Sequence, residues 1–325
     1  MTDKIRWGII GCGDVTELKS GPAFNKVAAS SLVAVMRRDV AKAKDYAQRH
    51  NVSKYYRDAA ALIADPDINA IYIATPPGSH EAYALAAIAA GKPVYVEKPM
   101  ALNFAAATQI KKRAEENNIK LVVAHYRRAQ PFFNKIKELI DEGAIGEPTH
   151  VDLAFDRIAL SEEELEQPQK AWRVDPAISG GGLFNDMAPH QLGLMLYYFG
   201  KVKNASGTSA NSNSLYMADD RVKGNIVFDN GIKFTGKWDF NAGSNADECI
   251  IYGNKGSISF PVFGEQHMMI NKNGAKEKIS FEAPYHVQQP MIAQAVQYFL
   301  GKAENPCPAE EGCEVMRLME VFTGK

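Results

Sequence analysis

The sequence predicts an α/β protein in which a doubly wound parallel sheet comes first and an open, mostly antiparallel sheet follows. A short apolar segment, residues 4–10, runs straight into a turn that contains Gly11 and Gly13. Strand-like and helix-like segments then alternate as far as about residue 126, as in parallel sheets with helical crossovers. After about Thr149 the chain changes to long extended segments joined by hairpin turns, as in antiparallel sheets.

Length and composition fit two globular domains. The chain has 325 residues, 46% hydrophobic and 23% charged, so each half can bury an apolar core. We expect one domain at residues 1–125 and a second at residues 126–325, with the last helices able to pack back on the first domain. The net charge of −1 argues against binding to nucleic acid or to a membrane through bulk charge. Four scattered cysteines and the absence of a signal-like start are typical of a cytoplasmic protein.

The first domain is predicted from apolar strands that alternate with helices. The segment at 70–75, A-I-Y-I-A-T, is almost entirely apolar, which indicates a strand covered on both faces. Asp58 begins a short helix, and Gly143 ends the last one. We expect strands at residues 4–10, 31–36, 54–56, 70–75, 93–97 and 120–126, and helices at residues 40–50, 58–65, 79–91, 104–117 and 132–142.

The second domain is predicted from extended segments and turn chemistry. Asp229-Asn230-Gly231 and residues 253–256 have the composition of hairpin turns. The acidic run at 162–164 is expected to be a solvated loop. We expect strands at residues 149–158, 203–211, 222–228, 232–240, 247–252 and 257–260, and helices at residues 189–199, 287–300 and 308–322.

The turn after the first strand has the composition of a dinucleotide site. Gly11 allows the sharp turn, and Gly13 lets the backbone approach a pyrophosphate. The N–H groups at the start of the next helix face the anion. Thr16 stands where a third glycine is common, which serves close packing of helix on strand less well. The sequence therefore predicts a Rossmann-type cofactor site with contacts from Gly11, Cys12, Gly13, Asp14 and Val15.

The end of the second strand bears on which dinucleotide binds. NAD-preferring folds place Asp or Glu about 20 residues after the glycines, where it holds the ribose 2′-hydroxyl. Met36 stands at that place, followed by Arg37 and Arg38. Two guanidinium groups suit a 2′-phosphate, so we predict NADP, with NAD as the less favoured cofactor. The alternative is that both arginines are solvated turn residues.

A polar turn follows the strand at 70–75. Two prolines stiffen the segment A-T-P-P-G-S-H at 74–80, and Ser79 is placed to cap the next helix. Ligands bind at this carboxyl edge in open parallel sheets. We therefore assign Thr75, Pro76 and His80 to the cofactor site, although His80 also suits a polar helix start.

Glu97 and Lys98 follow the strand at 93–97 at the same sheet edge. The ammonium group of Lys98 can polarise an oxygen during hydride transfer, whereas the ordinary interpretation is a surface lysine. Further along, Asp186 and His190 are four residues apart, one helical turn. Pro189 suggests that a helix begins there. A histidine at a helix start is often structural, and no third ligand has a spacing that predicts a metal site.

These motifs together resemble the glucose–fructose oxidoreductase/inositol dehydrogenase/MocA (Gfo/Idh/MocA) family. Their order along the chain is that of the family and covers most of its length. The matching segments are G-I-I-G-C-G at 8–13, A-T-P-P-G-S-H at 74–80, E-K-P at 97–99, R-A-Q-P at 128–131, W-R at 172–173 and G-G-G-L-F-N-D-M-A-P-H at 180–190. Two positions depart from the family: Thr16 in the glycine turn, and Gly193, where many members carry an acid three residues after the histidine.

The resemblance implies an NAD(P)-dependent oxidoreductase with an N-terminal Rossmann domain and a C-terminal domain on an open sheet. It implies that Lys98 is catalytic and that Asp186 and His190 act beside it. We expect hydride transfer at a secondary alcohol or carbonyl of a sugar, polyol or related cyclic substrate. In this scheme His190 exchanges the hydroxyl proton, Lys98 stabilises the oxyanion and Asp186 positions the substrate or Lys98. Candidates to line the cleft are Tyr126, Arg128, Trp172 and Arg173. Glu97, Lys98, Trp172 and Arg173 are also assigned to the cofactor.

Two other functions stay open. The same fold can act on a non-sugar substrate such as a dihydrodiol or an α-keto compound, or bind NADP as a sensor without turnover. The resemblance also implies homodimers or homotetramers that associate through the C-terminal sheet. We expect that sheet to expose an apolar face, because apolar residues recur at period two within residues 222–240, at Ile226, Phe228, Phe234, Trp238 and Phe240.

Overall fold

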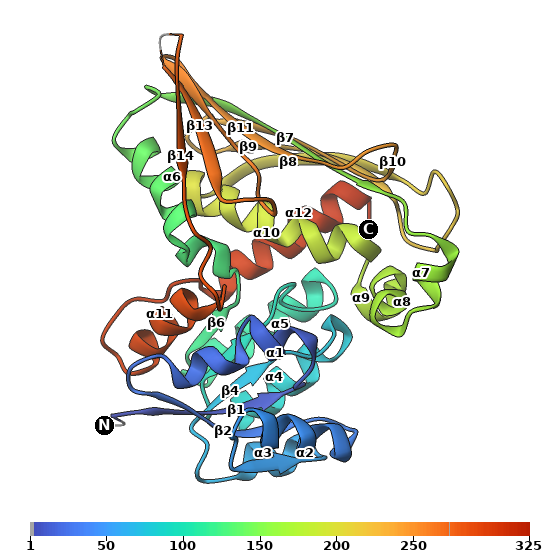
Figure 1. Cartoon of the computed structure of the whole chain (residues 1–325), viewed down its shortest axis with the longest axis vertical. Coiled ribbons are helices and arrows are strands. Elements are labelled where there is room, and N and C mark those ends of the chain that lie inside the picture. Colours follow the sequence, from blue (N-terminus) through green and yellow to red (C-terminus); the bar gives the residue numbers. More distant parts are fainter. Residues whose placement is uncertain (1–2, 273) are drawn as a thin grey trace. The chain divides into compact units, whose positions relative to one another are not determined.

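The computed structural model describes residues 3–272 and 274–325, and the chain divides into two compact units (Figure 1). Unit 1 consists of Met1–Gln130 and Pro284–Met316. Unit 2 consists of Pro131–Ala283 and Arg317–Lys325. Each unit is built around one sheet.

Unit 1 contains a six-stranded parallel sheet in the order β3-β2-β1-β4-β5-β6. This is the strand order of a doubly wound dinucleotide-binding fold, which confirms the predicted fold class. Strands β2 and β3 are added on one side of β1, and strands β4 to β6 on its other side. The glycine turn after β1 therefore lies at the topological switch point of the sheet. The strands are β1 (Ile5–Ile10), β2 (Ser30–Met36), β3 (Lys54–Tyr56), β4 (Ala70–Ile73), β5 (Val94–Val96) and β6 (Leu121–Val123).

Side-chain caps fix where several helices of unit 1 begin. Asp39 accepts hydrogen bonds from Ala41 N and Lys42 N, Asp58 from Ala61 N, and Asn103 from Ala106 N. The expected strand at 120–126 is shorter, because Tyr126 already begins a 3-10 turn. The helices are α1 (Asp14–Leu18), α2 (Val40–Arg49), α3 (Ala59–Ala64), α4 (His80–Ala89), α5 (Phe104–Glu116) and α11 (Gln289–Phe299), with the 3-10 turns η1 (Gly21–Asn25), η2 (Pro77–Ser79) and η3 (Tyr126–Ala129); α12 (Ala309–Thr323) contributes residues to both units.

An aromatic layer covers one face of the parallel sheet. Tyr72 and Tyr95 stack at 5.2 Å between ring centroids, and both are fully buried. Trp7 packs on Phe24 of η1 at 4.8 Å and on Phe299 of α11 at 5.5 Å. The C-terminal helix α11 therefore belongs to the core of the sheet that the N-terminal residues form.

Unit 2 contains an eight-stranded sheet in the order β14-β13-β12-β11-β7-β10-β9-β8. Among the described strands of this sheet, β7 and β10 are the only neighbours that pair in parallel, so the sheet is mostly antiparallel, as predicted. The two expected hairpin turns join β9 to β10 and β11 to β12. The strands are β7 (Pro148–Ile158), β8 (Val202–Ala210), β9 (Arg221–Phe228), β10 (Lys233–Ala242), β11 (Ala246–Gly253), β12 (Gly256–Phe260), β13 (His267–Lys272) and β14 (Ala275–Ser280).

Three expectations about unit 2 were wrong or incomplete. Strands β13 and β14 were not predicted, since their alternation of apolar and polar residues is weak. The acidic run is not a loop: it forms α7, because Ser161 and Glu164 make a reciprocal capping box at its start. Two short helices after it were also missed. The helices of unit 2 are α6 (Pro131–Asp141), α7 (Glu162–Glu166), α8 (Pro168–Val174), α9 (Pro176–Ser179) and α10 (Gly182–Phe199).

The apolar face of the mixed sheet is not open, which corrects the premise of the expected association. Ile226, Phe228, Phe234, Trp238 and Phe240 are all at most 2% exposed. Helix α10 and the end of α12 lie along this face (Figure 1). Phe184 of α10 contacts Trp238 at 5.1 Å, and Phe322 of α12 contacts it at 6.1 Å. The chain thus covers this face with its own helices.

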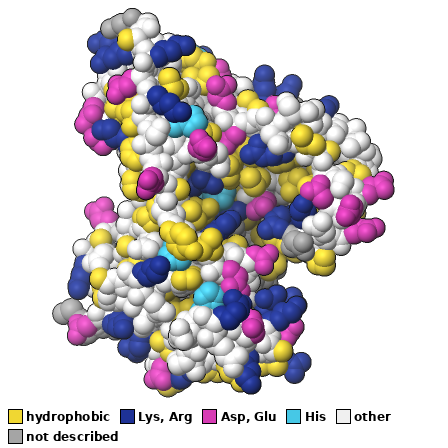
Figure 2. Space-filling view, viewed as in Figure 1, with side chains coloured by type: hydrophobic (Ala, Val, Ile, Leu, Met, Phe, Trp, Pro, Cys, Tyr) yellow, Lys and Arg dark blue, Asp and Glu magenta, His cyan; other side chains and the backbone are white. Residues whose placement is uncertain are grey.

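The surface bears charges of both signs. Basic and acidic side chains are interspersed over the visible face, with no large region of one sign (Figure 2). Within residues 3–272 and 274–325, no helix is both long and apolar enough to cross a membrane.

Candidate active site

The glycine turn is tied to the end of β2. The N–H groups of Gly11 and Cys12 donate to the Met36 carbonyl at 2.9 and 3.1 Å. Gly11 has φ of +96°, and a Cβ there would lie 2.7 Å from Cγ2 of Thr75. Only glycine fits this position.

Gly13 gives the structural test of whether the turn suits a dinucleotide. A Cβ on Gly13 would meet no protein atom within 4 Å. The absence of a side chain here therefore leaves an open approach to the backbone instead of relieving a clash. The next residues begin α1, whose first N–H groups lack helical partners as at any helix start. The turn fits a pyrophosphate group.

Two neighbours of the turn are packing residues. Thr16 is fully buried, its hydroxyl donates to the Gly13 carbonyl at 2.8 Å, and its own carbonyl accepts from Tyr46 at 2.7 Å. The departure from glycine is thus accommodated within the helix turn. Cys12 is buried as well, and burial raises the pKa of its thiol to about 11. The thiol is therefore protonated at neutral pH and is not a nucleophile.

The two arginines after β2 differ in their environments. Arg37 donates from Nη1 to the Cys12 carbonyl at 3.1 Å, so it lies against the glycine turn. Arg38 is exposed. Met36 is buried and offers no acceptor for a ribose hydroxyl. The end of β2 thus carries guanidinium groups where a carboxylate would favour NAD.

His80 links the two turns at the sheet edge. It is fully buried, with Nε2 2.7 Å from the Thr75 carbonyl and Nδ1 3.0 Å from the Pro99 carbonyl. Burial lowers the pKa of the imidazole, which favours the neutral ring. Ser79 does not cap α4 as expected, because its hydroxyl bonds within the turn: it lies 3.0 Å from the Pro76 carbonyl, an acceptor, and 2.8 Å from the hydroxyl oxygen of Thr75.

Glu97 is a buried carboxylate that faces three donors. Oε1 accepts from the Tyr72 hydroxyl and from Nε2 of Gln288, both at 2.6 Å, and Oε2 accepts from Lys98 N at 3.2 Å. Gln288 in turn accepts from the Tyr95 hydroxyl at 3.2 Å. Glu97 thus belongs to a buried hydrogen-bond network of unit 1 that includes the backbone N–H of Lys98. Lys98 itself is half-buried.

Tyr126 and Arg128 lie together in η3 of unit 1. Tyr126 is buried, and its ring is 5.7 Å from the guanidinium of Arg127. Arg128 forms an ion pair with Glu311 of α12. The guanidinium of Arg128 therefore has a fixed acidic partner within its own unit.

In unit 2, helix α10 begins at Gly182 and continues through Pro189, so the expected start at Pro189 was wrong. Proline removes one hydrogen bond and costs about 3 kcal/mol inside a helix. Here the residues from Ala188 to Leu196 are all buried, and this packing outweighs the cost. Asp186 and His190 consequently sit one turn apart within one helix.

Helix α8 brings Trp172 and Arg173 to this helix. Nε of Arg173 donates to Oδ2 of Asp186 at 3.2 Å, and the guanidinium lies 4.7 Å from the Trp172 ring centroid. Asp186 is therefore oriented by a cation that is itself stacked on an aromatic ring. The sequence suggested all three residues, but not that they form one group.

His190 is 7% exposed and packs against an aromatic ring that the sequence gave no reason to select. The Phe263 ring lies edge-on at 5.4 Å between centroids, with an interplanar angle of 81°. Gln288 and Glu311 were missed in the same way, since nothing in the local pattern marks them as partners of Glu97 and Arg128.

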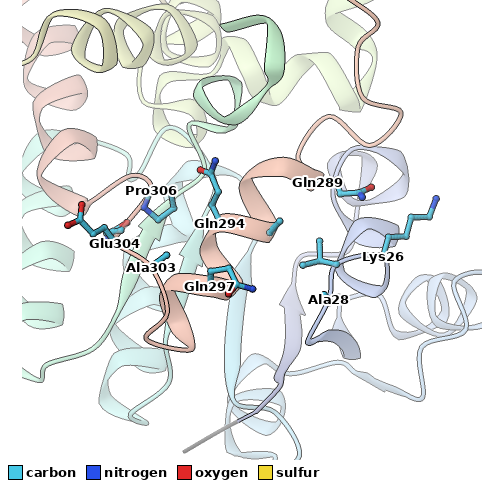
Figure 3. Close-up of a pocket in the computed structure, with 11 residues that line it drawn as sticks. Lys26, Ala28, Gln289, Gln294, Gln297, Ala303, Glu304 and Pro306 are labelled. Atoms are coloured by element: carbon cyan, nitrogen blue, oxygen red, sulfur yellow. The ribbon is translucent and has the colours of Figure 1, made fainter. Parts of the chain in front are cut away.

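A hollow in unit 1 lies away from the glycine turn. It measures about 590 Å³ and is lined by Lys26, Gln289, Gln294, Gln297 and Glu304, among others (Figure 3). Lys26 precedes β2, whereas the glycine turn follows β1, so the hollow is at the amino edge of the parallel sheet. None of the predicted site residues lines it. No group of metal-ligating side chains occurs among residues 3–272 and 274–325.

Comparison with known proteins identifies the family. The oxidoreductase family with an NAD-binding Rossmann fold, GFO_IDH_MocA, matches residues 5–125, and the GFO/IDH/MocA C-terminal domain matches residues 133–259. The chain belongs to the Gfo/Idh/MocA family. It is an NAD(P)-dependent oxidoreductase, and the predicted resemblance is confirmed.

Individual relatives extend over most of the chain. Oxidoreductase P35 of Formosa agariphila is 47% identical over 324 residues, covering 100% of both chains. Trans-1,2-dihydrobenzene-1,2-diol dehydrogenase of Xenopus laevis is 28% identical over 88% of this chain and 83% of its own. A levoglucosan dehydrogenase solved with NADH and levoglucosan has the same fold, with a TM-score of 0.87 at 21% identity, covering 98% of this chain and 96% of its own.

Proposed function

We propose that this oxidoreductase transfers hydride at a secondary alcohol or carbonyl of a sugar, polyol or related cyclic compound. The observation that carries the proposal is the Trp172–Arg173–Asp186 group beside His190 on α10. A carboxylate held by an arginine and a neighbouring imidazole suit a substrate with adjacent hydroxyl groups. Relatives that act on a dihydrodiol and a structural neighbour that binds levoglucosan are consistent with a cyclic diol or polyol.

In this proposal each residue has one role. A bound NAD(P) would supply the nicotinamide for hydride transfer. His190 takes or returns the hydroxyl proton, and Lys98 stabilises the charge on the reacting oxygen. Asp186, oriented by Arg173, accepts a hydrogen bond from a neighbouring substrate hydroxyl. Tyr126 is proposed to contact substrate, whereas the ion pair of Arg128 with Glu311 favours a supporting role for that residue.

We further propose that NADP is preferred over NAD. Arg37 lies against the glycine turn, Arg38 is exposed, and the last residue of β2 is Met36 instead of a carboxylate; the nearest acid, Asp39, caps α2. Gly11, Cys12, Gly13, Asp14 and Val15 are proposed to hold the pyrophosphate, with Thr75, Pro76 and Trp172 as further contacts. For Glu97 and His80 we propose an indirect role at the cofactor site, because both side chains are buried and hydrogen-bonded within unit 1.

The test is turnover with a panel of sugars, polyols and the dihydrodiol, using both cofactors. With the best substrate, His190→Ala should lower kcat by roughly 10²–10⁴ while cofactor affinity stays nearly unchanged. Lys98→Met should lower it at least as much, because it keeps the bulk and removes the charge. A folded His190→Ala protein with unaltered kcat would remove His190 from the mechanism. Fastest turnover with the dihydrodiol would favour the alternative substrate class, and binding of NADP without any turnover would favour a sensor.

A homo-oligomer that associates through the mixed sheet is also proposed, but through its outward face. The inward face is filled by α10 and α12, whereas the outward face carries side chains such as Lys223, Asn225 and Thr235 on strands β9 and β10. A sheet covered on one side only leaves this face available to a second copy.

A further inference from the structure

The orientation of His190 depends on more than its own helix. On α10 the position three residues further along is Gly193, which has no side chain to contact the imidazole. His190 is nevertheless buried, since only 7% of the residue is exposed. Its ring contact comes from a different part of unit 2, the link between β12 and β13, where Phe263 lies edge-on at 5.4 Å.

Phe263 is itself held from behind. Its ring packs at 5.0 Å on the ring of Phe155, a fully buried residue of β7. Perpendicular aromatic packing has a preferred geometry, so a fixed Phe263 ring favours one plane for the imidazole that meets it. The plane of the imidazole therefore depends on what holds Phe263 in place within the irregular link between β12 and β13.

The carboxylate of Asp247 on β11 holds that link. Oδ1 accepts from Val262 N at 3.0 Å, and Oδ2 accepts from Phe263 N at 2.6 Å and from Gly264 N at 3.0 Å. Three consecutive backbone N–H groups therefore converge on one charged side chain. Hydrogen bonds to an ionised acceptor are roughly twice as strong as neutral ones, and three of them leave the link little freedom.

We propose that Asp247 is a positioning residue that fixes the plane of the His190 imidazole through the ring of Phe263. The inference rests on the proposed role of His190 as the proton-exchanging group. Proton transfer requires the imidazole nitrogen to be aimed at the substrate hydroxyl, and small misplacements cost large factors in rate. In this proposal Asp247 takes no part in the chemistry and acts through the backbone N–H groups that it binds.

The first arm of the test needs no substrate. The full-length protein is labelled at histidine, and the ring signals of His190 are identified by their loss in His190→Gln. In Asp247→Asn, which keeps the shape but removes the charge, these signals should move toward the positions that they take in Phe263→Leu. Phe281→Leu is the matched control, because Phe281 is a half-buried aromatic of the same unit that packs on Phe132 at 5.8 Å. It should leave the His190 signals in place.

The second arm measures kcat with the best polyol of the panel and NADP. Asp247→Asn and Phe263→Leu should each lower kcat roughly tenfold with cofactor affinity unchanged, and Phe263→Tyr, which restores the ring, should stay within about twofold of the original protein. The double variant Asp247→Asn/Phe263→Leu should be no slower than Phe263→Leu alone, since Asp247 acts through that ring.

The outcomes separate this inference from the proposed function. Multiplying effects in the double variant, or unmoved His190 signals in Asp247→Asn, overturn the inference alone. A His190→Gln protein with full kcat overturns the proposed role of His190, and with it the catalytic consequence drawn here. In that case a signal shift in Asp247→Asn would still support the mechanical link from Asp247 to the imidazole.

Discussion

Replacing Tyr72 by Phe removes one hydroxyl from the fully buried network around Glu97 and leaves the aromatic stack in place. The hydroxyl carries a single proton, and its 2.6 Å contact with Oε1 is the shortest contact it makes. Burial, and after it the Glu97 charge, raise the pKa of Tyr72, so the group stays a donor at neutral pH. A hydrogen bond to a charged acceptor contributes about 1.5–3 kcal/mol to stability. We expect Tyr72→Phe to lower the free energy of unfolding of unit 1 by that amount.

The same unit offers a graded series of controls. Tyr46→Phe removes a hydroxyl that donates at 2.7 Å to the neutral Thr16 carbonyl, and Tyr95→Phe removes one that donates at 3.2 Å to the Gln288 amide. Both residues are buried like Tyr72. Neutral hydrogen bonds contribute about 0.5–1.5 kcal/mol, so both variants should be affected less.

Differential scanning calorimetry measures the series. For a unit of this size, each 1 kcal/mol corresponds to a Tm change of roughly 2–4 °C, so Tyr72→Phe should melt about 3–12 °C lower. A loss for Tyr72→Phe no larger than that for Tyr46→Phe would refute the argument. It would mean that the charge of Glu97 adds nothing to the bond, and that Glu97 is not the ionised centre of the network.

Three further predictions concern the cofactor, acid stability and assembly. Fluorescence titration should show that NADP(H) binds at least tenfold tighter than NAD(H), equivalent to about 1.4 kcal/mol. Arg38→Ala should weaken the binding of NADP(H) only. Tighter binding of NAD(H) by the original protein would contradict the assignment. Burial raises the pKa of Asp65, but hydrogen bonds from Lys54, Asp67 N and Tyr56 outweigh this and lower it to about 2. The ionised Asp65 therefore contributes about 2 kcal/mol to the free energy of unfolding above pH 3.8, and this contribution is lost as the pH falls to 2. Asp65→Asn should flatten the acid side of a plot of stability against pH. An unchanged acid side would contradict this. Light scattering at micromolar concentration should show a homo-oligomer that Thr235→Arg on the outward sheet face dissociates, whereas a monomeric original protein would rule it out.

Where the sequence predicted the fold well, the decisive information was local. The central strands β4, β5 and β6 of the parallel sheet are apolar and buried, and residues such as Asp58 and Gly143 mark helix ends through their own side chain or φ angle. Where it failed, a distant contact outweighed the local pattern. Pro189 remains inside α10 because the surrounding helix is buried against the sheet, which no local reading of proline could indicate. The apolar face of residues 222–240 was correctly recognised, but its cover comes from α10 and from α12 at the far end of the chain.

The residues of the candidate site divide in the same way, into those that local motifs identify and those that only distant contacts reveal. Motifs name Lys98, Asp186 and His190, because chemistry requires those residue types at those positions. Some of their surroundings come from far away in the sequence: Gln288 is 191 residues from its partner Glu97, and Phe263 is 73 residues from His190, whereas Arg173 is only 13 residues from Asp186. A supporting residue needs only a suitable polar group or ring at the right place in space, so composition and spacing leave no trace of it.

The buried polar groups explain why the C-terminal segment belongs to the cofactor half of the fold. Buried donors and acceptors need partners, and Gln288 supplies one to Glu97, one to Tyr95 and, through its N–H, one to the Lys19 carbonyl at 3.1 Å. His286 adds a contact of Nδ1 with the Leu18 carbonyl at 2.6 Å. These contacts reach both the turn after α1 and the strand end that carries Lys98. A dinucleotide-binding half built from the N-terminal residues alone would leave the Glu97 carboxylate with one donor fewer and the Trp7 ring without Phe299. The C-terminal segment of unit 1, residues 284–316, therefore helps to position Lys98 in addition to covering the sheet.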